Sequence, residues 1–332
     1  MDSPLFKLLT DPVSLLSGMI IRPPRAKYSV YDLGHKRFTI AGCPGEFERQ
    51  DFQVRGGRGL LLECSHFVPK QAPPARKLPC VVYLHGSCSS RLEALDTLRE
   101  LLPRGLTVCC VDFSGSGLSE GEYISLGHWE EKDLAELIRH LRNSGGVSSI
   151  GLWGRSMGAA TAVLRASQDP AIAACVLDSV FGCLPTVARE LVQKTRWKIP
   201  ETLVSMALDR VRKEVQAKAD FDLEELRPVA FAARSRVPAL FAVAKEDDFV
   251  LPHHTYDVHK AWGCADKKLV TVGGHHDSLR PKKFVQYAAD FLQQRLLLAA
   301  KDGDGRPTTP VRAKRISQEP AVRRTPTRFG GC

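Results

Sequence analysis

The sequence lacks the patterns by which metal ions or disulfides hold small folds together. None of its cysteines forms a C-x-x-C pair, and no combination of Cys and His has a spacing that suits zinc. Several cysteines lie in apolar stretches, where Cys packs as a small apolar residue. We therefore expect free thiols in a reducing compartment, no metal and no cofactor. The cysteines are Cys43, Cys64, Cys80, Cys88, Cys109, Cys110, Cys175, Cys183, Cys264 and Cys332.

Long apolar runs and targeting patterns are also missing. No run of 18 apolar residues exists, so the sequence predicts no membrane-spanning helix. The first residues carry no basic cluster, and Asp11-Pro12 interrupts their apolar stretch, so we expect no secretory signal peptide. The pattern G-x-x-x-x-G-K-[ST] is absent, which excludes a P-loop nucleotide site. Together with the free thiols, these absences predict a cytoplasmic protein.

Positive charge is in excess, but it is concentrated near the C-terminus. The net charge is +10, and residues 300–332 hold eight Lys or Arg residues against three acidic ones. The segment 299–332 is rich in Gly, Pro, Thr and Arg and has little to bury, so we expect a disordered basic tail. The remaining body is only mildly basic and has no folded basic motif, so we expect no nucleic-acid partner.

The body of the chain, residues 37–298, has the rhythm of an α/β domain. Strand-like stretches at 37–41, 51–55 and 59–68 suggest an antiparallel entry to a larger sheet. From residue 79 strands and helices alternate, which predicts a mostly parallel central sheet with helices on both faces. The later strands are predicted at 80–84, 106–111, 149–153, 172–177, 239–244 and 268–272, and the helices at 90–102, 129–142, 157–167, 252–262 and 283–298.

Two segments stand apart from this rhythm. Residues 181–232 are predicted to form amphipathic helices, including 184–193 and 201–215, as a cap inserted over the carboxyl ends of the strands. Residues 1–36 begin with an apolar stretch that either docks on the body or touches a membrane surface.

One turn has the sequence pattern of a catalytic site. An apolar strand ending at Trp153 is followed by Gly154-Arg155-Ser156-Met157-Gly158, a G-x-S-x-G, and then by an alanine-rich helix start. Such a strand–turn–helix exposes the serine Oγ at the N-terminus of a helix, where the dipole favours developing negative charge. We therefore expect Ser156 to be a nucleophile on a tight elbow.

A serine nucleophile needs a histidine base and an orienting carboxylate, in the chain order Ser…Asp/Glu…His. The loop after strand 239–244 contains Glu246, Asp247 and Asp248, and the loop after strand 268–272 contains His275 and His276. The order and the strand-end positions suit a triad. Neither the acid nor the histidine is selected by spacing alone.

An oxyanion hole requires two backbone N–H groups aimed at the developing charge. One is expected from Met157, the residue after the nucleophile. The other is expected in the loop after strand 80–84, from Ser87 or its neighbour Cys88. In the same loop, His85 is expected to brace the backbone. Asp112 lies outside the triad order, so the Gly/Ser-rich loop that it begins is expected to be scaffold.

These motifs resemble the intracellular eukaryotic α/β-hydrolases of the serine-aminopeptidase-like, bud-emergence-type group. The resemblance runs from Ile21 to about residue 295. It departs at the oxyanion loop, His-Gly-Ser-Cys instead of His-Gly-Asn-(Ser/Gly), and at Glu246, where relatives tend to have Asp. Its most specific stretches are Ile21–Ala26, Asp112–Gly121, Gly151–Gly158, Asp247–His254 and His276–Pro281.

The resemblance implies an α/β-hydrolase fold with Ser156, Asp247 and His276 as the triad. Family spacing selects Asp247 over Asp248, and the His-Asn-Ser-Pro-Arg-Pro of relatives aligns with His276 rather than His275. It also implies hydrolysis of an ester, thioester or amide through an acyl-enzyme. We expect a small-molecule or acyl-lipid substrate, with esters and thioesters favoured over peptides. A catalytically silent scaffold that uses the fold for binding is the alternative hypothesis.

The ends of the chain generate a testable prediction. The apolar N-terminus and the basic tail together predict peripheral binding to an anionic membrane, since each basic residue near such a surface adds about 1 kcal/mol. In flotation with phosphatidylserine-containing liposomes, the full chain should float and a chain lacking residues 299–332 should float less. Recovery of both chains in the soluble fraction would contradict this expectation.

Overall fold

The described strands form one nine-stranded sheet in the order β1-β2-β3-β5-β4-β6-β7-β8-β9. The structure is a computed structural model that describes residues 12–71, 77–194 and 201–301. The strands are β1 (Arg37–Phe38), β2 (Phe47–Arg55), β3 (Leu61–Pro69), β4 (Leu78–Leu84), β5 (Thr107–Val111), β6 (Val147–Arg155), β7 (Ile172–Asp178), β8 (Ala239–Ala244) and β9 (Lys267–Val272).

The first three strands form the antiparallel entry that the sequence predicts. β2 and β3 pair over their whole lengths, from Phe47 with Pro69 to Arg55 with Leu61, and a short turn joins them. β2 begins four residues before the predicted start at 51, because the buried Phe47 extends the pairing. β3 then joins the rest of the sheet through an antiparallel pairing with β5.

The remaining strands run parallel to one another from β5 to β9, as predicted. All residues of β5 and β8 are buried, which is the pattern of strands covered on both faces. Parallel strands place their carboxyl ends along one edge of the sheet. The loops after β4, β6, β8 and β9 therefore emerge on the same side of the molecule.

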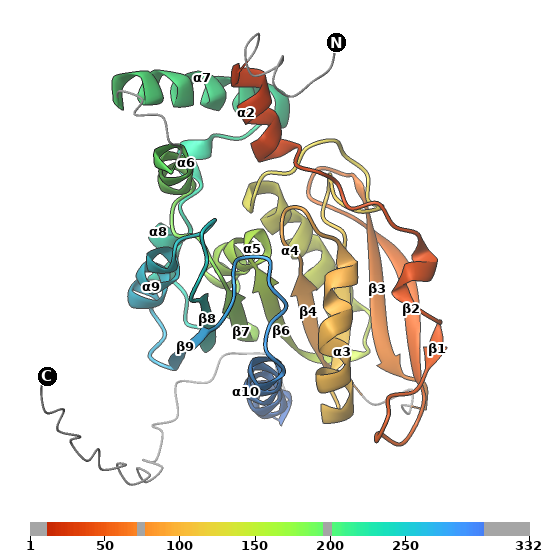
Figure 1. The fold of residues 1–332 in the computed structure, drawn as a ribbon. Helices are drawn as coiled ribbons and strands as arrows, with labels where there is room; N and C mark the ends of the chain where they lie inside the picture. The colour runs from red at the N-terminus through yellow and green to blue at the C-terminus, as the bar shows by residue number, and fades with distance from the viewer. Residues whose placement is uncertain (1–11, 72–76, 195–200, 302–332) are drawn as a thin grey trace, which may run out of the picture.

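Helices cover both faces of the sheet (Figure 1). On one face α3 and α10 contact each other and the strands, and on the other α4, α5, α8 and α9 pack together. The bounds of these helices are α3 (Leu95–Leu101), α4 (His128–Asn143), α5 (Met157–Ala166), α8 (Pro228–Ala232), α9 (Pro252–Ala261) and α10 (Lys282–Lys301), and the short 3₁₀ helices are η1 (Val30–Leu33), η2 (Arg91–Ala94), η3 (Leu102–Arg104) and η4 (Leu223–Glu225).

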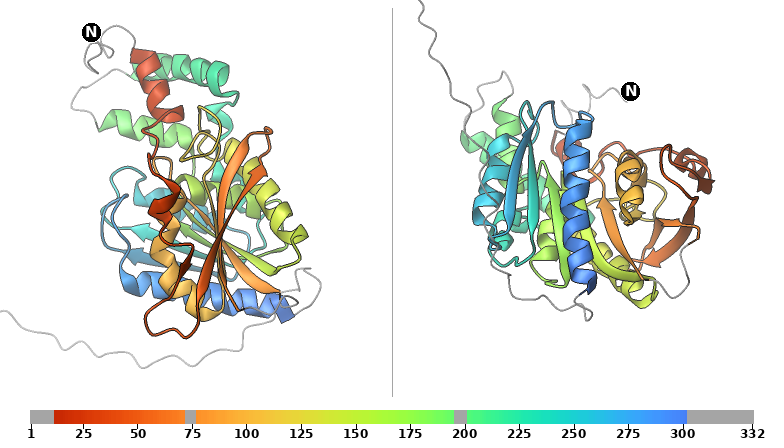
Figure 2. Two further views of the ribbon diagram at one scale, coloured as in Figure 1. Left: turned by 90° about the vertical axis from the view of Figure 1, so that its right-hand side faces the viewer. Right: turned by 90° about the horizontal axis from the view of Figure 1, so that it is seen from below.

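Two helices between β7 and β8 stand above the sheet, as the left view of Figure 2 shows. They are α6 (Leu184–Gln193), which has its predicted bounds, and α7 (Glu201–Ala219), which runs four residues further than predicted. The N-terminal α2 (Pro12–Ile21) packs against α7. The described part of the N-terminal segment is therefore docked, which is one of the two interpretations that the sequence allowed.

The chain ends extend partly beyond the described residues. α10 reaches Lys301, three residues past the predicted domain end at 298. The predicted basic tail beyond residue 301 and the apolar residues before 12 lie outside the described part. Among the described helices, none combines the length and apolarity needed to cross a bilayer.

Candidate active site

Ser156 lies at a sharp turn between β6 and α5. Its backbone has φ 52° and ψ −116°, a conformation that L-residues rarely adopt. The turn is possible because the residues two positions before and two positions after Ser156 have no side chain. A Cβ on Gly154 would lie 2.2 Å from the carbonyl oxygen of Gly158, and one on Gly158 would lie 2.0 Å from that of Leu84. Both positions of the G-x-S-x-G motif therefore need glycine.

A continuous hydrogen-bond chain joins the three side chains that the sequence singled out. The Oγ of Ser156 lies 2.9 Å from Nε2 of His276, and Nδ1 of His276 lies 2.7 Å from Oδ2 of Asp247. All three residues are less than a tenth exposed. They come from the ends of β6, β8 and β9, where parallel strands deliver their loops to one edge.

The carboxylate of Asp247 is held as an ion. Its Oδ1 accepts hydrogen bonds from the amides of Phe249 (3.1 Å) and Val250 (2.9 Å), and its Oδ2 faces His276. Burial alone would raise the pKa of Asp247, but the hydrogen bond and charge of His276 and the two amides outweigh burial and lower it. The carboxylate can therefore orient the imidazole and stabilise its protonated form.

The alternative acid and histidine lie on the surface. The side chains of His275 and Asp248 are 68% and 77% exposed and come no closer to each other than 3.9 Å. The amide of His275 donates to the Oγ of Ser278, which shapes the turn before His276. The structure thus brings Asp247 and His276 to Ser156 and leaves their neighbours outside the chain of contacts.

The loop after β4 passes close to the nucleophile. An added Cβ on Gly86 would lie 3.9 Å from the Cβ of Ser156, so this backbone is within reach of a bound carbonyl. The amide of Gly86 donates to Glu93 (3.0 Å), whereas the amide of Ser87 has no acceptor among the described residues. Met157 is the first residue of α5, so its amide has no intrahelical partner. The amides of Ser87 and Met157 are therefore available to an oxyanion.

The buried side chains of His85 and Asp112 stabilise the backbone around the oxyanion loop. The ring of the fully buried His85 donates from Nδ1 to the carbonyl of Gly86 (2.7 Å) and accepts at Nε2 from the amide of Phe113 (3.1 Å). The buried carboxylate of Asp112 accepts from the hydroxyl of Tyr28, at 2.6 Å, and from two backbone amides. Both residues thus have the bracing and scaffold roles that the sequence suggested.

Two arginines hold the loop between β9 and α10, residues 273–281, which we call the histidine loop. Sequence reasoning did not identify either of them. Arg155 donates to the carbonyl oxygens of His276 and Ser278. Arg280 donates to the carbonyl of His276 (3.2 Å) and pairs with the carboxylate of Asp178 at 2.7 Å. Arg155 is the first of the two variable residues of G-x-S-x-G, and Arg280 belongs to the His-Asp-Ser-Leu-Arg-Pro stretch. Both therefore lie inside recognised motifs, but the motifs assign no role to their side chains.

Among the described residues, Glu190, His253 and His254 gather ligand atoms within 4.8 Å of one another. The amide of Gly182 donates to Nδ1 of His254, which puts the ring proton on Nε2, and Nε2 lies 2.9 Å from Glu190. A metal at Nε2 would need the opposite tautomer. Burial also lowers the pKa of His254 and favours its neutral form. We therefore interpret this group as a hydrogen-bonded link between α6 and α9.

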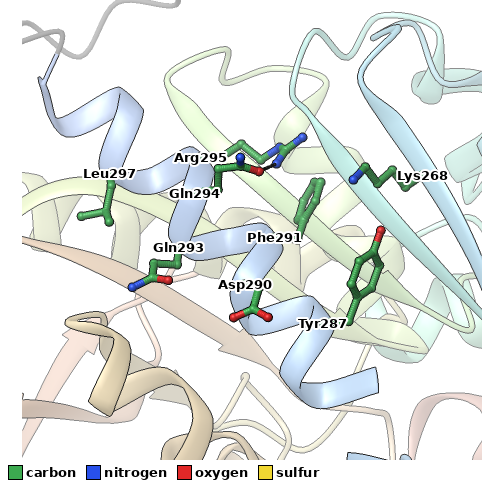
Figure 3. A pocket seen from close by; sticks show the side chains of 8 residues that line it. All are labelled: Lys268, Tyr287, Asp290, Phe291, Gln293, Gln294, Arg295 and Leu297. Atoms are coloured by element: carbon green, nitrogen blue, oxygen red, sulfur yellow. Dashed lines mark hydrogen bonds between the residues drawn. The ribbon is translucent and has the colours of Figure 1, made fainter. Parts of the chain in front are cut away.

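A hollow of about 490 Å³ lies along α10 and the edge strand β9, as shown in Figure 3. Lys268 and Tyr287 face each other across it. The guanidinium of Arg295 is already paired with Asp266, at 2.9 Å and 3.0 Å. No triad or oxyanion residue lines this hollow, so it is separate from the candidate active site.

The tight approach at the elbow generates a stability prediction. Gly158→Ala should lower the free energy of unfolding by about 3 kcal/mol or more, because its methyl group would collide with the backbone of Leu84. Gly146→Ala is the matched control, since the nearest atom to its Cβ is 4.0 Å away, and its effect should stay within about 0.5 kcal/mol. Urea unfolding measures both, and equal stabilities for the two variants would contradict the packing argument.

The contacts of Asp247 generate a pH prediction. Because its pKa lies below the usual value of about 3.9, its stabilising contribution is complete above that pH and is lost as the pH falls through the folded-state pKa. The stability difference between wild type and Asp247→Asn should be constant above about pH 5 and shrink below about pH 4. Urea unfolding between about pH 7 and pH 3 measures this difference, and one that grows on acidification would refute the assignment.

Comparisons with known proteins place this geometry in context. The sequence profile of the Hydrolase_4 family, described as "Serine aminopeptidase, S33", matches residues 75–225, which is less than half of the chain. The uncharacterized protein YqkD of Bacillus subtilis is 25% identical over 210 residues, which cover 62% of this chain and 65% of that protein. The uncharacterized protein YfhR of Escherichia coli K12 is 24% identical over 163 residues, or 48% and 56%. The chain thus spans less than two thirds of these relatives.

Solved structures give the fold. The esterase Pf2001 of Pyrococcus furiosus has a TM-score of 0.59 at 20% identity and covers 84% of this chain and 98% of its own. An acetyl xylan esterase from Paenibacillus sp. R4 has a TM-score of 0.57 at 16% identity and covers 89% and 96%. These relatives are archaeal and bacterial, so the eukaryotic, bud-emergence-type subgroup stays a prediction. The architecture itself is confirmed: this chain has the α/β-hydrolase fold.

Proposed function

We propose that the chain is a serine hydrolase of the serine-aminopeptidase-like group, which cleaves a carboxylic ester or thioester through an acyl-enzyme. The observation that carries the proposal is the unbroken chain of hydrogen bonds from Asp247 through His276 to Ser156. A serine hydroxyl is a weak nucleophile without such a base. A silent scaffold would have no need to keep this chain intact inside a buried site.

The geometry supports a two-stage acyl transfer. The Oγ of Ser156 attacks the substrate carbonyl carbon while Nε2 of His276 takes its proton, and Asp247 stabilises the imidazolium. The carbonyl oxygen becomes an oxyanion that the amides of Ser87 and Met157 stabilise. As the tetrahedral intermediate collapses, the bond to the alcohol or thiol breaks and His276 protonates the leaving group. Water, deprotonated by His276, then attacks the acyl-enzyme and releases the acid and free Ser156.

Two exposed apolar side chains indicate an apolar acyl group. Phe249 is 45% exposed, and its ring centroid lies 5.1 Å from that of His276. Leu279 is 80% exposed and lies in the loop that carries His276. Large apolar side chains left open beside a catalytic base suit an acyl chain better than a charged peptide terminus. Ester cleavage also agrees with the structural neighbours, which are an esterase and an acetyl xylan esterase.

Labelling with a fluorophosphonate probe tests this function. The wild-type chain should react covalently at Ser156, and Ser156→Ala should not react at all. His276→Gln should slow labelling by about 10³-fold or more, because the serine loses its base. The readout is in-gel fluorescence followed by mass spectrometry of the modified peptide.

His275→Gln is the matched control, because it changes the adjacent histidine on the surface. Its labelling rate should stay within about twofold of wild type, as expected for an exposed group with weak contacts. No labelling of the wild type, or labelling that persists in Ser156→Ala, would favour the silent scaffold instead.

A further inference from the structure

Glu93 lies where the three loops of the candidate active site meet. Its Oε2 accepts the amide hydrogen of Gly86 at 3.0 Å, in the oxyanion loop. Its Oε1 lies 3.5 Å from Nη1 of Arg155, the residue before the nucleophile. The same arginine donates through Nη2 to the carbonyl of His276. A single ion pair thus connects the oxyanion loop, the elbow and the histidine loop.

The ion pair between Glu93 and Arg155 is largely buried. The side chains of Glu93 and Arg155 are each 14% exposed. Glu93 belongs to η2, which begins after Ser90, whose hydroxyl accepts from the amide of Leu92. The amide of Arg91 in the same turn donates to the fully buried carboxylate of Asp112 at 2.7 Å. The backbone turn that carries Glu93 is therefore anchored to the core independently of the oxyanion loop.

The contact engages the amide of Gly86 and leaves the next amide, that of Ser87, free for the oxyanion. Gly86 and Ser87 are consecutive, and only one of their amides is satisfied inside the protein among the described residues. By accepting from Gly86, the carboxylate fixes the peptide before Ser87 and leaves the Ser87 amide for a ligand. A bare carboxylate near a developing oxyanion would repel it, and the guanidinium of Arg155 offsets that charge.

We propose that Glu93 and Arg155 are positioning residues that align the oxyanion loop with the nucleophile and the base. The inference rests on the proposed function, because it concerns the geometry of the same acyl transfer. Neither residue contacts the reacting atoms. They act through Gly86 on the Ser87 amide and through the carbonyl of His276 on the imidazole. A displacement of about 1 Å in such a site costs about 10²-fold in rate.

Three substitutions of Glu93 distinguish the effect of its negative charge from the effect of its side-chain length and from a loss of stability. Glu93→Ala removes the acceptor for Gly86 and the partner of Arg155. Glu93→Asp keeps the charge but shortens the reach by one methylene. Glu93→Gln keeps the reach and an acceptor oxygen. Glu136→Ala is the matched control, because it breaks a surface glutamate–arginine pair, Glu136 with Arg139, on α4.

The measurements are the rate of fluorophosphonate labelling and the thermal midpoint of each variant. We expect Glu93→Ala and Glu93→Asp to label about 10- to 100-fold more slowly than wild type, with Glu93→Gln recovering most of the rate. Glu136→Ala should label at the wild-type rate. If Glu93 has only a structural role, the labelling rate of each variant should fall in proportion to its thermal midpoint. If Glu93 is a positioning residue, the labelling rate should instead depend on whether the side chain at position 93 has an acceptor oxygen that reaches the amide of Gly86.

The outcomes distinguish this inference from the proposed function. If the wild type labels at Ser156 and Glu93→Ala or Glu93→Asp labels within about twofold of it, the positioning role is overturned and the hydrolase function stands. If the wild type does not label, the function itself fails. Should Glu93→Ala be unfolded at the assay temperature, the ratio of the Asp to the Gln variant decides: a rate for Glu93→Asp equal to or above that for Glu93→Gln overturns the inference.

Discussion

The candidate site depends on one backbone contact, the approach of Gly158 in α5 to the carbonyl of Leu84 at the end of β4. This contact brings the start of the helix against the neighbouring strand, and the chain passes from β6 to α5 through the strained turn at Ser156. The strain persists because β6 and its neighbours β4 and β7 are mostly buried, so the surrounding packing holds the turn in this conformation. Nucleophile and oxyanion loop are neighbours because those two backbones touch.

The rest of the site follows from the register of the parallel strands. β8 and β9 pair from Ala239 with Lys267 to Ala244 with Val272, so the loops that follow begin level with each other. The acid and the histidine consequently meet although 29 residues separate them. Loops at the edge of a sheet make few hydrogen bonds within themselves. In this chain the guanidinium groups of two arginines donate hydrogen bonds to the histidine loop. Arg155 and Arg280 donate to main-chain carbonyl oxygens of the histidine loop, and these acceptors are present whichever side chains the loop carries at positions 276 and 278.

Sequence reasoning reached the fold and the three contacting side chains, because periodicity locates strands and a triad has a fixed order. It could not choose between His275 and His276 without the resemblance, since adjacent residues differ only in which way the turn directs them. Glu93 left no signal at all: a glutamate in a short turn resembles any solvated acid. Its contacts span 7 and 62 residues of sequence and depend on tertiary packing, which local patterns do not encode.

The docking of α2 on α7 has a consequence for the order in which the chain folds. A contact between Lys218 and Ser14 joins residues 204 positions apart, so the first described helix packs on one of the last parts of the cap to be synthesised. At ribosomal rates of about 5–20 residues per second, α2 waits on the order of ten seconds or more for its partner. During that interval the face of α2 that packs against α7 has nothing to cover it. The nascent chain therefore exposes an apolar helix that a chaperone could bind, well before the site can form.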